Sequence, residues 1–417
     1  MRTRRWHMRG TGLRWISAAA VSALVLTGCA SKEERAQSAG ETGNAGWSAG
    51  ADTIKIGLIA PMTGAYAILG ILQENSIRVE MDRVNEAGGV GGAKLELVVR
   101  DTALDPAKAV QASNELVGDS QVHFVVGPSL SAFYNASKNI FETNRKLNCQ
   151  PGVGTGDFGS LKYGFRSQDP NNLSVEKLVE YLKAKGVSSV GLVYEADDTG
   201  KAMDGYLKEY GPKYGVEYKG YQETRNDDQS HRPYVDALKD AGAIIVSSNA
   251  SGAKTMAAAA ESGYKGVMAG TSGLQNVSFL DAAQDMAVGS VFAAGNVEFN
   301  IRDRATWKPG YRAHVEAVEK KYGVVEGPKS GAKMPKGTAI AGDCIVAFAA
   351  AAESAKSLDA DKLATAMEQL NIPDTETASG NTIKPADHEF YHMEDIHVYQ
   401  WDKDADGWFV TDVTPQS

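Results

Sequence analysis

The sequence predicts an α/β protein with two lobes, each built on a parallel sheet. Two observations lead to this fold class. Short apolar, β-branched runs alternate with helical stretches from Thr53 onward, and a second alternating series begins near Asp169. Strands that alternate with helices form parallel sheets with right-handed crossover connections. A chain of 417 residues is long enough for two domains of ordinary size.

The first series extends to about Asn144. Its apolar segments have strand length, and glycines or prolines separate them from helical stretches. Asp105 followed by Pro106 is a typical helix start, because the aspartate caps the helix and proline suits its first position. The predicted strands cover residues 54–62, 93–101 and 122–127, and the predicted helices cover 105–119 and 131–144.

The second series opens with a helix, predicted over 169–186, whose apolar residues recur at helical spacing. Strands and helices again alternate after it, and the C-terminal segment alternates residue by residue around an Ala-Asp-Gly turn. Strands are predicted at 188–195, 243–249, 266–273 and 288–296, helices at 308–321, 337–356 and 359–370, and a β-hairpin at 396–412.

The N-terminus has the pattern of a bacterial lipoprotein signal. Five arginines precede an apolar stretch, 15–28, that is too short to span a bilayer. The stretch runs into LTGC, which resembles the lipobox whose cysteine, here Cys29, is acylated. Residues 1–28 are therefore predicted to be a signal peptide. Residues 29–52, rich in Ala, Gly and Ser, are predicted to be the lipidated cysteine and a flexible tether. Sec and Tat export both stay open.

The charge balance excludes some partners. Loss of residues 1–28 removes five arginines and no acid, so the net charge of −9 becomes −14. An acidic surface argues against binding to nucleic acid or to anionic lipid through a basic patch.

The stretch FVVGPSLSAF, residues 124–133, places hydroxyl groups at the end of a buried strand. Ligands of open parallel sheets bind outside the carboxyl ends of the strands. Backbone N–H groups and a serine hydroxyl at the next helix would suit an anion or carboxylate. Alternatively, Ser129 or Ser131 only caps that helix. The loops 60–70 and 149–159 also offer small and hydroxylic residues, so three loops are expected to converge on one sheet edge.

Two cysteines remain beside Cys29. Cys149 and Cys344 could form a disulfide in an exported protein, or both could be free buried thiols, and the residues alone favour neither.

Five segments between Ile54 and Trp408 match, in order and spacing, the segments of a known protein family. They are IKIGLIAPMTGAYAILG, NEAGGVGGAKLELVVRDTALDPAKAVQASNELV, VVGPSLSA, GTSGL and DHEFYHMEDIHVYQW. In them the chain resembles the type I periplasmic binding proteins, specifically the branched-chain amino acid (leucine/isoleucine/valine-binding) receptors of ABC transporters. The resemblance implies two Rossmann-like lobes, joined by three crossing strands, that close on a small ligand. It assigns residues 53–167 and 296–395 to lobe 1, and 168–295 and 396–417 to lobe 2. With Cys149 and Cys344 in the same lobe, a disulfide between them stays possible.

The resemblance also implies site residues. The family's carboxylate-binding positions fall at Ser131, and at Gly152 with Thr155 after a one-residue shift. In lobe 2 the match ends. Where the family has an acidic residue that binds the ligand ammonium, this chain has Ser272. The positions of two family tyrosines fall near Ser248-Asn249 and at Thr199, and that of a first-loop aromatic residue falls at Leu69.

These departures bear on the ligand. A buried ammonium without a charged acceptor is costly. A neutral polar head or second carbonyl is therefore favoured unless Asp197 or Asp198 substitutes. We expect an amino acid, an amide or a small carboxylate. The expected ligand-binding residues are Ser131, Gly152, Thr155, Thr199, Asn249 and Ser272.

The segment HEFYH matches the H-E-x-x-H zinc motif and supports an alternative, a zinc-dependent hydrolase using His388, Glu389 and His392. Pro385 precedes it and a strand pattern follows, which favours structural histidines. The main prediction is a binding protein with no catalytic residue, cofactor or metal. It is an extracytoplasmic solute-binding lipoprotein of an ABC importer, anchored on the outer face of the cytoplasmic membrane, with a permease as partner. A ligand sensor of the same fold is a third hypothesis.

Overall fold

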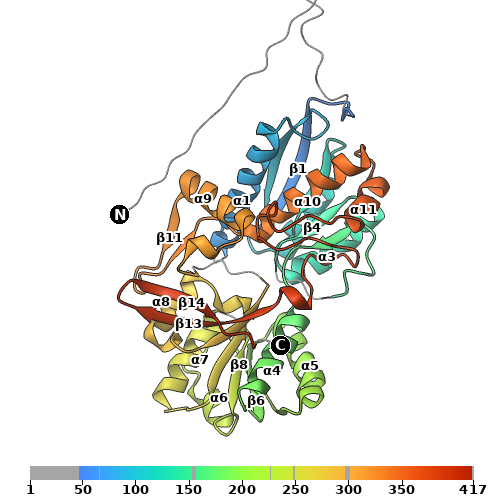
Figure 1. Ribbon diagram of the computed structural model, residues 1–417. Helices are drawn as coiled ribbons and strands as arrows, with labels where there is room; N and C mark the ends of the chain where they lie inside the picture. The colour runs from blue at the N-terminus through green and yellow to red at the C-terminus, as the bar shows by residue number, and fades with distance from the viewer. Residues whose placement is uncertain are drawn as a thin grey trace, which may run out of the picture. The chain divides into compact units, whose positions relative to one another are not determined.

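The computed structural model of the chain describes residues 47–64, 66–152, 156–225, 227–247, 249–295 and 301–415 (Figure 1). The predicted signal peptide, Cys29 and most of the predicted tether lie outside these residues. Within the described part of the chain, each helix is too short or too polar to traverse a lipid bilayer.

The first sheet has five parallel strands in the order β2-β1-β3-β4-β5. Strand β1 lies inside this sheet, between β2 and β3, and apolar side chains on both of its faces are fully buried. The strands are β1 (Thr53–Ala60), β2 (Lys94–Asp101), β3 (Val122–Val126), β4 (Asn148–Gln150) and β5 (Gly164–Arg166).

Helices cover both faces of this sheet. Alternate residues of a strand point to opposite faces, and the two faces of β1 accordingly enter different cores. Ile56 and Leu58 pack with α1 (Ala67–Glu86) and α10 (Ala339–Ala355). Ile59 packs instead with α2 (Pro106–Gly118) and α3 (Ser131–Thr143). We call this sheet and its helices, with α9 (Pro309–Tyr322) and α11 (Ala360–Glu368), the first lobe.

The second sheet has seven strands in the order β14-β13-β10-β9-β8-β6-β7, and its strands from β10 to β7 are parallel. The predicted C-terminal hairpin is confirmed, since β13 and β14 are antiparallel neighbours at one edge. The strands are β6 (Ser189–Glu195), β7 (Glu217–Thr224), β8 (Ala243–Val246), β9 (Val267–Thr271), β10 (Val291–Ala294), β13 (His397–Asp404) and β14 (Gly407–Asp412).

This sheet also lies between two apolar layers. One contains α4 (Asn171–Ala184) and α5 (Asp198–Tyr214). The other contains α6 (Arg232–Ala237), α7 (Asn249–Glu261) and α8 (Val277–Ala283). We call the sheet and these helices the second lobe. The predicted α/β class with parallel sheets is confirmed; the residue boundaries predicted for the lobes stay a prediction.

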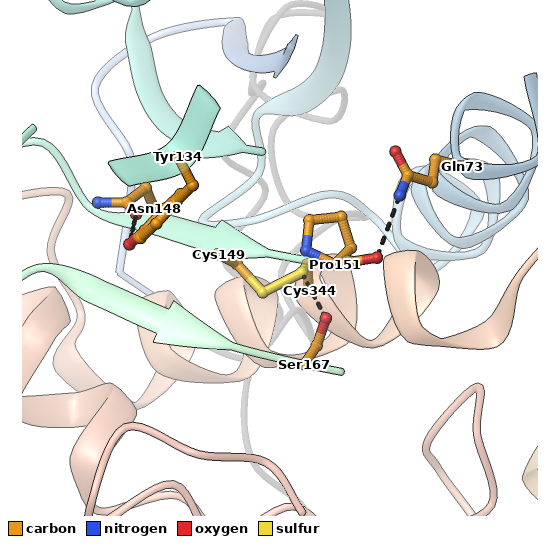
Figure 2. The surroundings of a disulfide bond; sticks show 7 residues. All are labelled: Gln73, Tyr134, Asn148, Cys149, Pro151, Ser167 and Cys344. Atoms are coloured by element: carbon orange, nitrogen blue, oxygen red, sulfur yellow. Dashed lines mark hydrogen bonds between the residues drawn. A yellow bond between two sulfur atoms is a disulfide. The ribbon is translucent and has the colours of Figure 1, made fainter. Parts of the chain in front are cut away.

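A disulfide ties the first sheet to its covering helix. Cys149 lies in β4 and Cys344 in α10, both side chains are fully buried, and the two sulfurs are bonded (Figure 2). Of the two alternatives that the sequence left open, the structure has the disulfide. The Ser167 hydroxyl lies 3.2 Å from the Cys344 sulfur, on the connection that leads toward α4.

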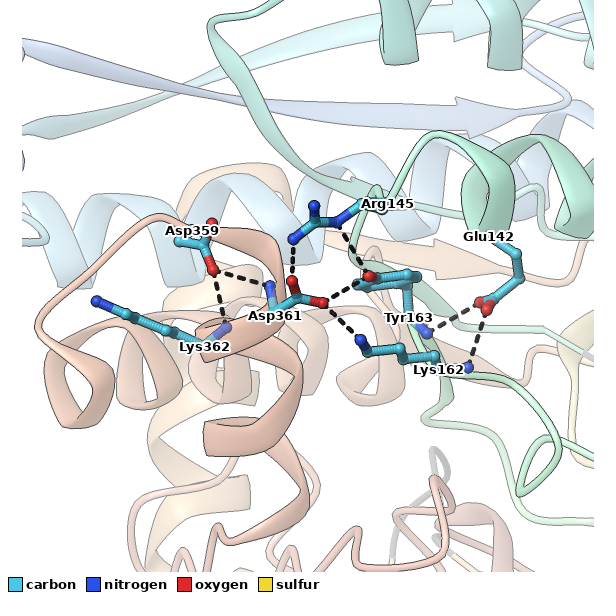
Figure 3. A network of polar contacts seen from close by, with 7 residues as sticks. All are labelled: Glu142, Arg145, Lys162, Tyr163, Asp359, Asp361 and Lys362. Carbon is cyan, nitrogen blue, oxygen red and sulfur yellow. Dashed lines mark hydrogen bonds and ion pairs between the residues drawn. The ribbon is translucent and has the colours of Figure 1, made fainter.

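An exposed polar network holds α11 against the start of β5 (Figure 3). The Asp361 carboxylate accepts from the Tyr163 hydroxyl at 2.7 Å and pairs with Lys162 at 2.6 Å, and it also pairs with Arg145. The Glu142 carboxylate accepts the backbone N–H groups of Lys162 and Tyr163, each at 2.9 Å. The network therefore fixes the loop before β5 from two sides.

Candidate ligand-binding cleft

A cleft of about 440 Å³ has walls from both lobes. Several of its residues directly follow the carboxyl end of a strand, where ligands of open α/β sheets bind. From the first lobe and the hairpin after α9 come Tyr66, Ile68, Leu69, Leu72, Leu130, Ser131, Ala132, Val325, Met334 and Ile340. The other wall contains Gln168, Glu195, Asp197, Asp198, Thr199, Ser247, Ser272, Gly273, Gln275, Asn276, Val277 and Ser278.

The two serines after β3 have different roles. Ser129 is buried, and its hydroxyl donates to the Gln73 side chain. The Gln73 amide in turn donates to the Pro151 carbonyl at 3.1 Å (Figure 2). Ser131 is the first residue of α3 and lines the cleft. Leu130 is the N-cap of α3 and no side chain caps it, so the capping interpretation of either serine is wrong.

The predicted loop after β4 reaches the site only in part. A Cβ atom on Gly152 would lie 1.9 Å from the Ser129 carbonyl oxygen, so any larger residue would displace the serine loop. Gly152 therefore packs closely against the backbone of that loop, and it is not among the residues that line the cleft. Thr155 lies outside the described residues. Asn249 begins α7, but the described residues do not include its side chain.

Thr199 and Ser272, the other predicted residues, lie on the second-lobe wall of the same cleft as Ser131. The Ser272 hydroxyl accepts a hydrogen bond from the Gln168 amide at 3.3 Å, and the same amide donates to Asp169 at 2.7 Å. The structure thus brings three of the six predicted residues together. Their part in ligand binding stays a prediction.

Acidic side chains at the end of β6 give the cleft its charge. Glu195, Asp197 and Asp198 all line it, and Asp197 also caps α5 by accepting the Gly200 N–H at 2.7 Å. Burial raises the pKa of Asp197, and the neighbouring Asp198 charge raises it further. Tyr66 lies opposite: burial raises its pKa, and the charges of Glu195 and Asp197 add to the effect. A cation in the cleft would stabilise the charged form of these carboxylates.

Glu195 was not identified from the sequence as a cleft residue, although its position at the end of a predicted strand could have indicated it. The apolar part of the lining, which we call the apolar wall although its residues come from both lobes, was named from the sequence only at Leu69. Its other members are Leu72, Leu130, Val277, Val325, Met334 and Ile340. Two of these residues come from a segment rich in Gly, Pro and Lys that has no apolar periodicity.

A second cavity, of about 510 Å³, lies where the chain passes between the lobes. Arg166 and Glu389 line it as a nearly buried ion pair, with an Nε–Oε2 distance of 2.7 Å. Burial raises the pKa of Glu389 to about 7, although the Arg166 charge opposes the shift. The guanidinium also lies 4.7 Å from the Phe158 ring centroid. Because its central charges already pair with each other, this cavity is the weaker candidate for a ligand site.

The H-E-x-x-H segment does not have the geometry of the zinc motif. It is not helical: Glu389 forms a β-bridge with Arg166, and His388 has a left-handed backbone with φ of 68°. The His388 ring is 2.8 Å from the Gly164 carbonyl oxygen through Nδ1, and the His392 ring is 3.2 Å from Asp387. The motif needs both histidines on one helix face, so the hydrolase alternative has no geometric support here.

Two parallel-sheet lobes that share a cleft at their strand ends define the class of bilobed solute-binding proteins. The model of a family described as periplasmic binding protein matches residues 53–406. The chain belongs to this family, and the resemblance stated from the sequence is confirmed.

Named relatives agree with this assignment. The chain is 26% identical over 374 residues to the leucine-, isoleucine-, valine-, threonine-, and alanine-binding protein of Pseudomonas aeruginosa, covering 87% of this chain and 94% of that one. It is similar in fold to the substrate binding protein LivJ from Streptococcus pneumoniae in complex with isoleucine (TM-score 0.69, 21% identity, 86% and 99% of the two chains). A solute binding protein from Rhodopseudomonas palustris in complex with 3,4-dihydroxy benzoic acid is equally similar (TM-score 0.71, 20% identity, 88% and 99%).

Proposed function

We propose that the protein is an extracytoplasmic solute-binding lipoprotein of an ABC importer and that its ligand is an α-amino acid with an apolar side chain. The observation that carries this proposal is that three chemically distinct sets of groups line one cleft. Ser131 and the first turn of α3 are one set, Glu195 and Asp197 a second, and the apolar wall the third.

Each set suits one group of an amino acid. The N–H groups in the first turn of α3 have no acceptor within the helix, so with the Ser131 hydroxyl they favour a carboxylate. Glu195 and Asp197 replace the missing acidic residue at Ser272 as partners of the ammonium. The apolar wall receives the side chain. Relatives named for leucine, isoleucine and valine support the same ligand class.

Binding would work through lobe closure. A ligand that contacts both walls binds the closed arrangement more tightly than the open one, and so shifts the population toward it. The closed protein would then deliver the ligand to a permease. The lipobox at Cys29 would hold the protein on the outer face of the cytoplasmic membrane.

A thermal-shift series on the full chain tests the ligand class. Leucine carries all three groups; isocaproate lacks the amino group, isoamylamine lacks the carboxylate, and leucinamide neutralises it. A ligand at a hundred times its Kd stabilises a protein by about 2.7 kcal/mol. We expect a clear shift with leucine and much smaller shifts with the three analogues. A larger shift with isocaproate or with dihydroxybenzoate than with leucine would contradict the proposal and show that the ligand is a simple carboxylate.

Substitutions test which residue binds which group of the ligand. Ser131→Ala should weaken leucine binding. Glu195→Gln should raise the Kd for leucine by about tenfold or more, because hydrogen bonds to charged groups contribute roughly 1.5–3 kcal/mol. Asp285→Asn, on an exposed carboxylate that pairs with Lys403 away from the cleft, is the matched control and should leave binding unchanged.

A further inference from the structure

A short hairpin reaches from the first lobe to the second. It consists of β11 (Val324–Glu326) and β12 (Lys333–Pro335), which are antiparallel, and it connects α9 to α10. Its base is fixed to the first lobe, because the Lys336 N–H donates to the Gly323 carbonyl at 3.0 Å and the Asn75 amide of α1 donates to the Lys336 carbonyl at 2.8 Å.

The tip of the hairpin is fixed to the second lobe instead. One oxygen of Asp281, in α8, accepts the backbone N–H groups of Lys329 at 2.6 Å and Ser330 at 2.8 Å. The Trp408 indole, from β14, donates to the Ser330 carbonyl at 3.1 Å. Gly327 has no room for a side chain, since a Cβ atom there would lie 2.9 Å from both Asp281 and Val277. Two elements of the second lobe therefore hold the tip.

The inner face of the hairpin is apolar and buried. Met334 is 4% exposed and belongs to the same core as Leu72 of α1 and Val277 of α8. Met334 and Val325, which lie on opposite strands and pair directly, both line the cleft. The outer face carries the exposed Glu326 and Lys333, so the hairpin has one solvent face and one face toward the ligand site.

We propose that this hairpin, positioned by Asp281, is the wall that determines which length of apolar side chain the cleft accepts, with Met334 as the length-determining residue. The inference rests on the proposed function, because it takes the ligand to be an amino acid. Its basis is separate: a segment anchored to both lobes presents two apolar side chains to the cleft between them. Such a wall keeps a defined position only while its tip stays docked.

The test uses a homologous series on the full chain: aminobutyrate, norvaline, norleucine and aminoheptanoate, measured by isothermal titration. Burying one methylene group is worth about 0.8 kcal/mol, or roughly fourfold in Kd. The wild-type affinity should rise along the series and then fall where the chain meets Met334. In Met334→Ala the maximum should move to a longer member, with at least a fourfold gain relative to the shorter one. Val325→Ala on the paired strand makes the same prediction if Met334→Ala fails to fold.

Asp281 is tested as a positioning residue. Asp281→Ala should let trypsin cleave after Lys329 and Lys333 faster than in the wild type, and it should flatten the length preference. Asp281→Asn retains an acceptor oxygen and should restore much of both properties. Asp285→Ala, close by in the chain with an exposed carboxylate, is the control and should change neither.

The outcomes separate the two proposals. If the wild type binds none of these amino acids, the proposed function and this inference both fail. If the wild type binds them and both Met334→Ala and Val325→Ala keep the same length profile, the hairpin is not the determinant and only this inference is overturned. Unchanged tryptic cleavage in Asp281→Ala would overturn the positioning role.

Discussion

His314 of α9 lies between two residues of α1. Its Nδ1 is 2.6 Å from Glu80 Oε1 and its Nε2 is 2.9 Å from Ser76 Oγ, with all three side chains almost completely buried. Ser, His and Glu at these distances have the contacts of a catalytic triad. However, the serine is inaccessible, so the arrangement is a structural link between two helices. Arg83, partly exposed, completes it by pairing with Glu80 at 2.8 Å.

This link should make a large contribution to stability. Breaking a buried ion pair by removing one partner costs about 3–5 kcal/mol, because a buried polar or charged group loses its partner. Glu80→Ala should therefore lower the free energy of unfolding by that amount, as measured by urea denaturation. Glu74→Ala, which removes a partly exposed pair with Arg78 on the same helix, should cost less than about 1 kcal/mol. Equal losses in both variants would contradict the assignment.

The same link should contribute to acid sensitivity. Burial alone would raise the pKa of Glu80, but the hydrogen bond and charge of His314, and then those of Arg83, lower it below 4.5. A carboxylate with a lowered pKa stabilises the fold above its unfolded pKa, and this stabilisation is lost as the pH falls through the folded value. Melting curves between pH 6 and 3 should fall less steeply in Glu80→Gln than in the wild type, starting from a lower stability.

Asp343 in α10 should have the opposite effect. It is fully buried, accepts the N–H groups of Ala378 and Ser379, and has no partner for its second oxygen among the described residues. Burial raises its pKa to about 7. Between its unfolded pKa of about 3.8 and that value, the folded protein keeps a proton that the unfolded chain loses. Stability from this group therefore falls as the pH rises, by up to about 1.4 kcal/mol per pH unit.

Replacement of Asp343 by asparagine tests this effect. The amide keeps the acceptor oxygen and cannot ionise, so Asp343→Asn should melt well above the wild type at pH 8, and the difference should shrink steadily toward pH 4. Asp361→Asn, in the exposed network of Figure 3, should shift melting only slightly at both pH values. A variant with the pH slope of the wild type would show that another group is responsible.

Residues at strand ends were the part of the site that the sequence could predict. Strands were recognisable because buried parallel strands are continuous apolar runs. Once strands are assigned, their carboxyl ends follow, and this indicated the serines after β3. Thr199 and Ser272 came instead from the resemblance to the family. The predicted helix 337–356 likewise matches α10 to within two residues. Local patterns were sufficient in these cases because each element carries its own periodicity.

The hairpin at 324–335 was not predictable in this way. Its strands have three residues each, and the residues that hold its tip, Asp281 and Trp408, lie far away in the chain. The two residues that the hairpin contributes to the apolar wall, Val325 and Met334, were missed with it. The expectation of a neutral ligand head stays a prediction, and the alternative through Asp197 that the sequence left open is the one we propose, because Glu195 and Asp197 line the same cleft as Tyr66.

The affinity for an amino acid should depend on pH through Asp197. Burial and then the Asp198 charge raise the pKa of Asp197, so it takes up a proton at a higher pH than an ordinary aspartate. A protonated carboxyl group no longer pairs with an ammonium, and leucine affinity should fall as the pH is lowered through that pKa. Asp197→Asn keeps an oxygen to cap α5 and should bind leucine weakly with a flatter pH profile. Titration calorimetry from pH 8 to 4 measures both, and a pH-independent wild-type Kd would remove Asp197 from the site.

Reduction of the Cys149–Cys344 disulfide should destabilise the protein without abolishing ligand binding. The bond closes a loop of 195 residues, and the chain-entropy estimate for such a loop is roughly 5 kcal/mol. In a Cys29→Ala background, a reductant should lower the melting temperature, and the double variant Cys149→Ala, Cys344→Ala should melt low with or without reductant. Wild-type melting that is insensitive to reductant, after thiol titration shows the bond is open, would contradict this expectation.

Trp47, the first residue that the structure describes, is attached to the first lobe. The predicted tether extended to residue 52, but the Trp47 indole donates to Glu353 of α10 at 2.8 Å, and the other Glu353 oxygen accepts the Gly91 N–H at 2.7 Å. The Ala49 N–H also donates to the Gly91 carbonyl at 2.9 Å. Residues 47–52 are thus attached to the first lobe, although the sequence placed them in the tether. Limited proteolysis with mass spectrometry should find wild-type cleavage N-terminal to Trp47. Trp47→Ala should extend cleavage toward Thr53, whereas Ser48→Ala, which loses only a contact to Gly50, should not. Cleavage between residues 47 and 52 in the wild type at the same rate would mean that the contact with Glu353 does not hold this segment.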